Sequence, residues 1–220
     1  MKYFCAAIFN AAVVLMSGCA AGGDAQNVSI LNPTVAAAFA NFDETMASYR
    51  TPLSFENGTV VTSCEAYLAA RTDAKIEEGI HNRIVSQEYL ICDTIAALDA
   101  AIGARVGHRL PVPYGDELRT RLDLRSFPSS LRPVADEYPR IGDLEQVADV
   151  RVEGHAVIVE MDDWHFRLEV VAEGDVSRDG YEDWLVWLID EAHNGSYRDY
   201  SLLVIKRVDE KGCLRAATIK

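Results

Sequence analysis

The residues most able to do chemistry gather in one acidic stretch, GDVSRDGYEDWLV, which begins at Gly174. Oxygen-bearing residues alternate with other types, and a glycine permits a sharp turn in the middle. Calcium takes about six to eight oxygen ligands, which alternate residues of a tight loop can aim at one point. The spacing predicts a calcium site that uses Asp175, Ser177, Asp179, the backbone carbonyl of Tyr181, and Asp183. The alternative is a polar turn that leads into a strand.

The same stretch resembles the loop-to-strand unit of the FG-GAP and VCBS-type calcium-binding β repeats. That resemblance implies that the five residues just named carry calcium. Ser177 stands where the repeats have a carboxylate or an amide. Val186 stands where an EF-hand loop has its bidentate glutamate, which excludes a helix–loop–helix site. Only one copy is present, so the resemblance does not imply a propeller.

Few other residues have a spacing that suits catalysis. No H-E-x-x-H or H-x-H pattern joins any two of the histidines, which are His81, His108, His155, His165 and His193. Asp163 and His165 could form a carboxylate–imidazole general base, or they could be an exposed hairpin end. Trp184, Trp187 and Tyr181 could stack a ligand beside the acidic loop, although core packing is the stronger interpretation.

The N-terminus is typical of an exported chain. Lys2 precedes an apolar run from Phe4 to Met16, which is too short to cross a bilayer. The run ends in Ser-Gly-Cys19, which resembles the lipobox of bacterial lipoproteins. The resemblance implies cleavage after residue 18, acylation of Cys19 and attachment to the outer membrane, facing the periplasm. An ordinary secretory signal is the alternative.

Export also determines how the cysteines are interpreted, because disulfides persist in an oxidising compartment. Cys5 leaves with the signal and Cys19 carries lipid, so Cys64, Cys92 and Cys213 remain. We favour a Cys64–Cys92 disulfide, because both cysteines fall in helical patterns whose connection could fold back. Three reduced, buried cysteines are the alternative, and the state of Cys213 stays open.

Hydrophobic periodicity predicts an α+β fold, with N-terminal helices packed on a C-terminal antiparallel sheet or meander. Residues 1–18 form the signal, 19–33 a flexible tether, 34–107 a helical region and 108–220 an antiparallel β region. We expect the last two regions to form one compact domain. The strongest helix is expected from about Lys75 to Ala104. Strands are expected at Leu122–Leu124, Val150–Val152, Ala156–Met161, Trp164–Val171, 184–189 and 200–208, and residues 213–220 could form a last edge strand.

Composition limits the classes of function that this chain can have. A formal net charge of -13 argues against binding to nucleic acid. Hydrophobic residues make up 49% of the chain, which is typical of a globular protein. The leading hypothesis is a non-enzymatic binding or structural module of the cell envelope, stabilised by one calcium ion and able to contact an envelope protein. The alternative is a periplasmic hydrolase that uses Asp163 and His165 or the acidic loop.

Overall fold

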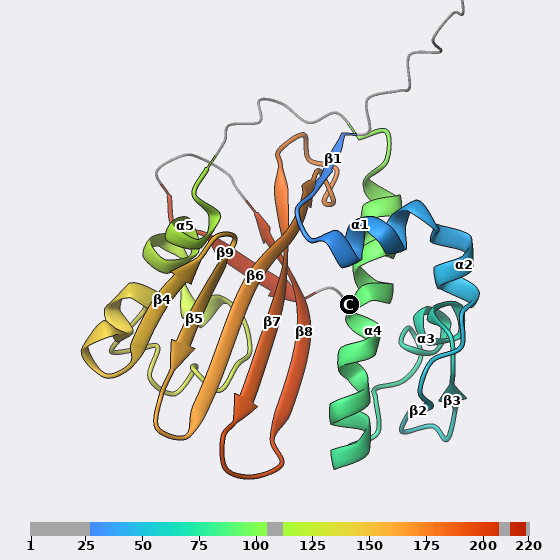
Figure 1. The fold of residues 1–220 in the computed structure, drawn as a ribbon, viewed down its shortest axis with the longest axis horizontal. Coiled ribbons are helices and arrows are strands. Elements are labelled where there is room, and N and C mark those ends of the chain that lie inside the picture. Colours follow the sequence, from blue (N-terminus) through green and yellow to red (C-terminus); the bar gives the residue numbers. More distant parts are fainter. Residues whose placement is uncertain (1–26, 105–111, 207–211, 219–220) are drawn as a thin grey trace, which may run out of the picture.

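The computed structural model describes residues 27–104, 112–206 and 212–218. Figure 1 shows one curved sheet with helices beside it and across one end. The helical segments are α1 (Pro33–Ala40), α2 (Phe42–Ala47), α3 (Cys64–Ala70), α4 (Ile80–Ala101), α5 (Tyr114–Arg121), and the 3-10 turns η1 (Leu124–Ser126) and η2 (Ile141–Gln146). The strands are β1 (Val28–Ile30), β2 (Leu53–Ser54), β3 (Val60–Val61), β4 (Asp149–Glu153), β5 (Ala156–Glu160), β6 (Trp164–Gly174), β7 (Asp183–Ala192), β8 (Arg198–Lys206) and β9 (Arg215–Thr218).

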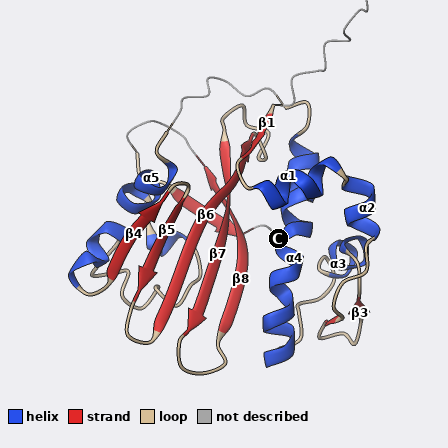
Figure 2. Cartoon of the chain, in the orientation of Figure 1, coloured by secondary structure: helices blue, strands red, loops and turns tan. Residues whose placement is uncertain are grey.

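The predicted α+β class and the C-terminal meander are confirmed. Strands β4 to β9 follow one another across the sheet in chain order, and all of these neighbours are antiparallel. Figure 2 separates the strands from helices α1–α4, which lie together along one side of the sheet. None of the described helices combines the length and apolar character needed to cross a membrane.

The sheet has an apolar layer on each face, because side chains alternate along its strands. Phe166, Leu168 and Val170 of β6 pack into a core that includes Leu118 of α5 and Leu124 of η1. The opposite face packs against α4. There, residues such as Leu90 and Leu98 of the helix meet residues such as Leu185 and Leu202 of the sheet. The long strands β7 and β8 are therefore apolar on both sides over much of their length.

A third, smaller core lies on the side of α4 that faces away from the sheet. Figure 1 shows α4 between the sheet and the group formed by α2, α3 and the β2–β3 hairpin. Leu53, Phe55, Tyr67 and Tyr89 are buried there, beside the Cys64–Cys92 disulfide. The disulfide has its two Cα atoms 5.1 Å apart and joins α3 to α4. This is the pairing that the sequence favoured, and Cys213 is a free, exposed cysteine.

The structure corrects three sequence predictions. Residues 19–33 are not a flexible tether throughout, because Val28–Ile30 pairs with Ala172–Gly174 of β6. Lys75 does not begin the long helix, since α4 starts after Gly79. Leu122–Leu124 is not a strand of the sheet. Helix α5 buries Leu118 and ends at Arg121, and the alternating leucines that follow it belong to a bend that leads into η1. A leucine pair spaced two apart can arise from such a bend as well as from a strand.

Candidate functional site

The acidic loop between β6 and β7 is held together by its own backbone amides. The carboxylate of Asp175 accepts hydrogen bonds from the N–H of Asp179 at 3.0 Å and of Gly180 at 2.9 Å. Asp183 accepts one from the N–H of Ser177 at 2.8 Å. Asp179 accepts one from Tyr181 at 3.0 Å. The sequence-predicted ligands are therefore brought into one tight turn, in which each carboxylate has a structural role without an ion.

Two details of this loop bear on calcium. Asp183 is fully buried, and its Oδ1 atom has no hydrogen-bond partner among the residues that the structure describes. Burial raises the pKa of its carboxyl, and the charge of Asp179 adds to that rise. Asp179 already has a cation, because its Oδ2 lies 3.3 Å from Nζ of Lys206. An ion at Asp183 would satisfy the buried oxygen but would compete with Lys206 for Asp179.

The described residues hold no group of three or more His, Cys, Asp or Glu side chains placed to bind a metal ion together. Calcium also binds hydroxyl and carbonyl oxygens. The part of the loop that best fits a calcium site is therefore Asp183 together with Ser177 and the backbone. Calcium binding at this loop stays a prediction.

The aromatic residues around the acidic loop do not form one wall. Trp184 is fully buried in the sheet core, whereas Tyr181 is exposed. Trp187 lies farther along β7 and borders a cleft formed with the N-terminal helices. The predicted grouping of Trp187 with Trp184 and Tyr181 is therefore wrong, and a ligand contact of Trp187 stays a prediction.

The carboxylate partner of His165 is Glu160 and not Asp163. Nδ1 of His165 lies 2.8 Å from Oε1 of Glu160, and Nε2 of His193 lies 3.3 Å from Oε2 of the same carboxylate. Burial raises the pKa of Glu160, but the hydrogen bond from His165 and the nearby positive charges outweigh this effect, so the pKa lies below its usual value. Asp163 is exposed and contributes its backbone carbonyl, which accepts the N–H of His193 at 2.9 Å.

A cavity with a well-defined lining lies between the N-terminal helices and the sheet. It has a volume of about 750 Å³ and receives side chains from α1, α2, α4 and β7. One part of its lining is apolar or small, and the rest is polar. The lining residues are Thr34, Ala37, Ala38, Asn41, Glu44, Thr45, Ser48, Arg50, Gln87, Glu88, Ile91 and Trp187. We call this cavity the α1–α4 cleft.

Local structure fixes the walls of the α1–α4 cleft. Asn32 caps α1, because its Oδ1 accepts the N–H groups of Thr34 at 2.9 Å and Val35 at 3.2 Å. Thr45 of α2 donates its hydroxyl to the carbonyl of Ala38 at 3.0 Å, which ties α2 to α1. The indole N–H of Trp187 donates to Oγ1 of Thr94 at 2.8 Å, which holds the ring against α4. The lining is therefore positioned before any ligand enters.

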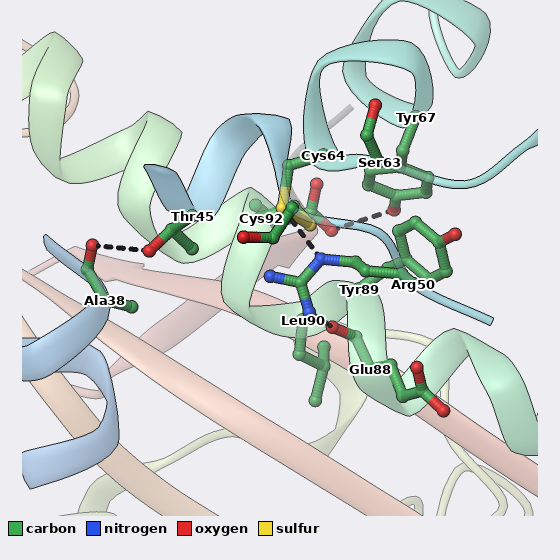
Figure 3. The surroundings of a disulfide bond; sticks show 12 residues. Ala38, Thr45, Arg50, Ser63, Cys64, Tyr67, Glu88, Tyr89, Leu90 and Cys92 are labelled. Atoms are coloured by element: carbon green, nitrogen blue, oxygen red, sulfur yellow. Dashed lines mark hydrogen bonds between the residues drawn. A yellow bond between two sulfur atoms is a disulfide. The ribbon is translucent and has the colours of Figure 1, made fainter. Parts of the chain in front are cut away.

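Arg50 lies at the edge of the cleft, beside the disulfide (Figure 3). Its Nε donates to Sγ of Cys64 at 3.1 Å, and its Nη1 donates to the carbonyl oxygen of Glu88 at 3.1 Å. Sequence reasoning did not find Arg50, because a single arginine after a helix has no distinctive spacing. The only local signal was the Thr51-Pro52 pair, which indicates the helix end just beyond it.

No family model, no curated protein and no solved structure gives a significant match to this chain. The resemblance of the acidic loop to calcium-binding β repeats therefore stays a prediction, as does the lipobox, since Cys19 lies outside the described residues.

Proposed function

We propose that this chain is a binding module of the cell envelope that takes a small ligand into the α1–α4 cleft. The observation that carries the proposal is the cleft itself, which has about 750 Å³ of space and a pre-positioned lining. Clefts of about 300–1,000 Å³ with mostly apolar walls and a few fixed polar groups are typical of ligand sites. Ile91 and Trp187 supply apolar surface here, and Arg50 and Gln87 supply polar groups.

The contents of the cleft favour binding over catalysis. Its lining includes neither histidine nor cysteine. The hydroxyls of Thr45 and Ser48 donate to the backbone carbonyls of Ala38 and Glu44, so neither is paired with a general base. His165, which the hydrolase alternative used with Asp163, pairs with Glu160 instead, and these two residues come from β6 and β5, which do not contribute to the cleft.

A hydrophobic fluorescent probe tests the proposal. Phenylnaphthylamine is neutral and becomes brighter when it leaves water for an apolar site. We expect the purified protein to bind it saturably, at one site per chain. Ala37→Trp should fill the cleft and weaken binding by at least tenfold, whereas Ala104→Trp, outside the cleft, should leave it unchanged. Equal binding by both variants, or no saturable binding, would rule the cleft out as a ligand site.

We also propose that Cys19 anchors the module to the membrane, as the lipobox resemblance implies. The support is the sequence alone, because this part of the chain is outside the described residues. In a bacterial host, Cys19→Ser should move the protein from the membrane fraction to the soluble periplasmic fraction and abolish labelling by a radioactive fatty acid. Retention of the label in the variant would contradict acylation at this residue.

A further inference from the structure

Arg50 is a cation that has no directly paired carboxylate among the described residues. Among the described residues its guanidinium forms no ion pair, and its two side-chain hydrogen bonds go to the sulfur of Cys64 and the backbone carbonyl of Glu88. Its Nη2 atom donates no hydrogen bond within that part of the chain. Burial lowers the pKa of Arg50, with Tyr89 and Glu88 offsetting part of that effect. A partly buried guanidinium that no carboxylate pairs with directly is a favourable place for an anion.

The nearby carboxylate of Glu88 is held by other donors. Its Oε1 accepts the hydroxyl of Thr51 at 2.8 Å, and its Oε2 accepts the backbone N–H of Thr51 at 3.3 Å. Glu44 also lines the cleft and is exposed. The two carboxylates limit how much negative charge the cleft accepts, and they favour a ligand with a single anionic group over one with several.

The position of Arg50 is fixed by contacts on both sides. Its backbone N–H donates to the carbonyl of Thr62 at 2.7 Å. The carbonyl of the next residue, Thr51, accepts the hydroxyl of the buried Tyr89 at 2.8 Å. Figure 3 shows the guanidinium between the disulfide and Glu88, turned toward the side on which Thr45 and Ala38 lie. A guanidinium held in this way loses little further freedom when it binds an anion.

We propose that Arg50 binds the acidic group of the ligand, and that the ligand is an organic anion whose apolar body lies against Ile91 and Trp187. The acidic group is a carboxylate, sulfonate or phosphate, each of which accepts hydrogen bonds from a guanidinium. The disulfide acts as a positioning element, because Sγ of Cys64 orients Nε of Arg50. The inference rests on the proposed function and names the class of ligand that the cleft takes.

A pair of matched probes separates this inference from the proposed function. Anilinonaphthalene sulfonate carries the same aromatic body as phenylnaphthylamine together with one negative charge. The net charge of -13 repels anions from most of the surface, so a preference for the sulfonate requires a local cation. We expect the wild-type protein to bind the sulfonate more tightly than the neutral probe. Arg50→Gln should weaken binding of the sulfonate at least tenfold and should weaken binding of the neutral probe far less.

Two further variants sharpen the test. Arg50→Lys keeps the charge but loses the planar fork, so its affinity for the sulfonate should lie between those of wild type and Arg50→Gln. Arg132→Gln removes an exposed arginine that pairs with Asp136, and it should change neither probe. Thermal unfolding of each variant shows whether the fold is intact, and inorganic phosphate or acetate as competitor shows which acidic group is preferred.

The outcomes are distinguishable. Binding of both probes with equal affinity in wild type and Arg50→Gln would overturn the anion site and leave the cleft as a ligand site. Loss of both probes from Arg50→Gln, with the fold intact, would also overturn it, because the arginine would then shape the cleft as a whole. Failure of both probes to bind the wild-type protein would remove the proposed function along with the inference.

Discussion

Asp190 of β7 lies directly opposite Asp199 of β8, so two carboxyl groups share one face of the sheet. Asp190 is fully buried, and its Oδ2 accepts the backbone N–H of Ser130 at 2.7 Å, whereas its Oδ1 has no hydrogen-bond partner in the described part of the chain. Burial raises the pKa of Asp190 to about 6, and the charge of Asp199 contributes to the rise. Burial also raises the pKa of Asp199.

Replacement of Asp190 by asparagine should stabilise the protein at neutral pH. The pKa of the folded state lies above the unfolded value of 3.8, so the folded state holds the proton more tightly. The contribution of Asp190 to stability is therefore complete below about pH 4 and is lost as the pH rises toward 6 and beyond. Asparagine keeps the acceptor for Ser130 and never ionises. At pH 8 we expect Asp190→Asn to raise the free energy of unfolding by about 1–3 kcal/mol.

Urea unfolding of both proteins at pH 4 and pH 8 checks this expectation. The difference between them should be close to zero at pH 4, where both side chains are neutral. A gain of the same size at both pH values would instead point to improved packing. A loss of stability at pH 8 would show that the ionised carboxylate is needed, for example to hold Ser130.

Removal of the Cys64–Cys92 disulfide should destabilise the chain through its unfolded state. The bridge closes a loop with a sequence separation of 28, for which the chain-entropy model gives about 3–4 kcal/mol. We expect the double substitution Cys64→Ala and Cys92→Ala to lower the free energy of unfolding by about this amount, and so to lower the urea midpoint. Cys213→Ala removes an exposed free thiol and should leave the midpoint unchanged. An unchanged midpoint in the double variant would mean that packing around Tyr67 and Tyr89 alone holds α3 on α4.

Calcium should raise the thermal midpoint if the buried Oδ1 of Asp183 is a ligand. A ligand present at about 100 times its dissociation constant adds roughly 2.7 kcal/mol. The measurement is differential scanning calorimetry in millimolar calcium and in excess chelator. Asp183→Asn removes the charge of this predicted ligand and should abolish the shift, whereas Asp162→Asn, at an exposed aspartate outside the loop, should retain it. Superimposable transitions with and without calcium would leave the acidic loop as a polar turn.

Gly115 should not tolerate alanine. A Cβ atom at this position would lie 2.5 Å from Cγ1 of Val152 and 2.7 Å from the backbone oxygen of Ala156, so α5 would have to move away from the sheet. Overpacking of this kind costs about 1–3 kcal/mol. Gly79→Ser, at an open helix start, should cost no more than about 0.5 kcal/mol. Chemical denaturation measures both variants, and an equally stable Gly115→Ala protein would contradict the packing of α5 on β4 and β5.

Local pattern was enough to predict much of the fold. The alternation of apolar and polar residues in β4 and in the first part of β6 is visible in the sequence. The pattern failed for Val28–Ile30, which is a three-residue strand among small polar residues. It pairs with Ala172–Gly174, more than 140 positions away in the chain, and nothing local specifies that pairing.

The candidate site, like the fold, could be predicted from the sequence only in part. The sequence by itself determined which side chains are present, and its spacing placed Asp175–Asp183 in one turn and favoured the bond between Cys64 and Cys92. Only the tertiary structure decided that Arg50 meets a sulfur and a backbone carbonyl, while Glu88 is held by Thr51. Periodicity reports which face of an element is buried. It does not report which charged groups on different elements meet, because those contacts depend on how α4 packs against residues nearly forty positions earlier.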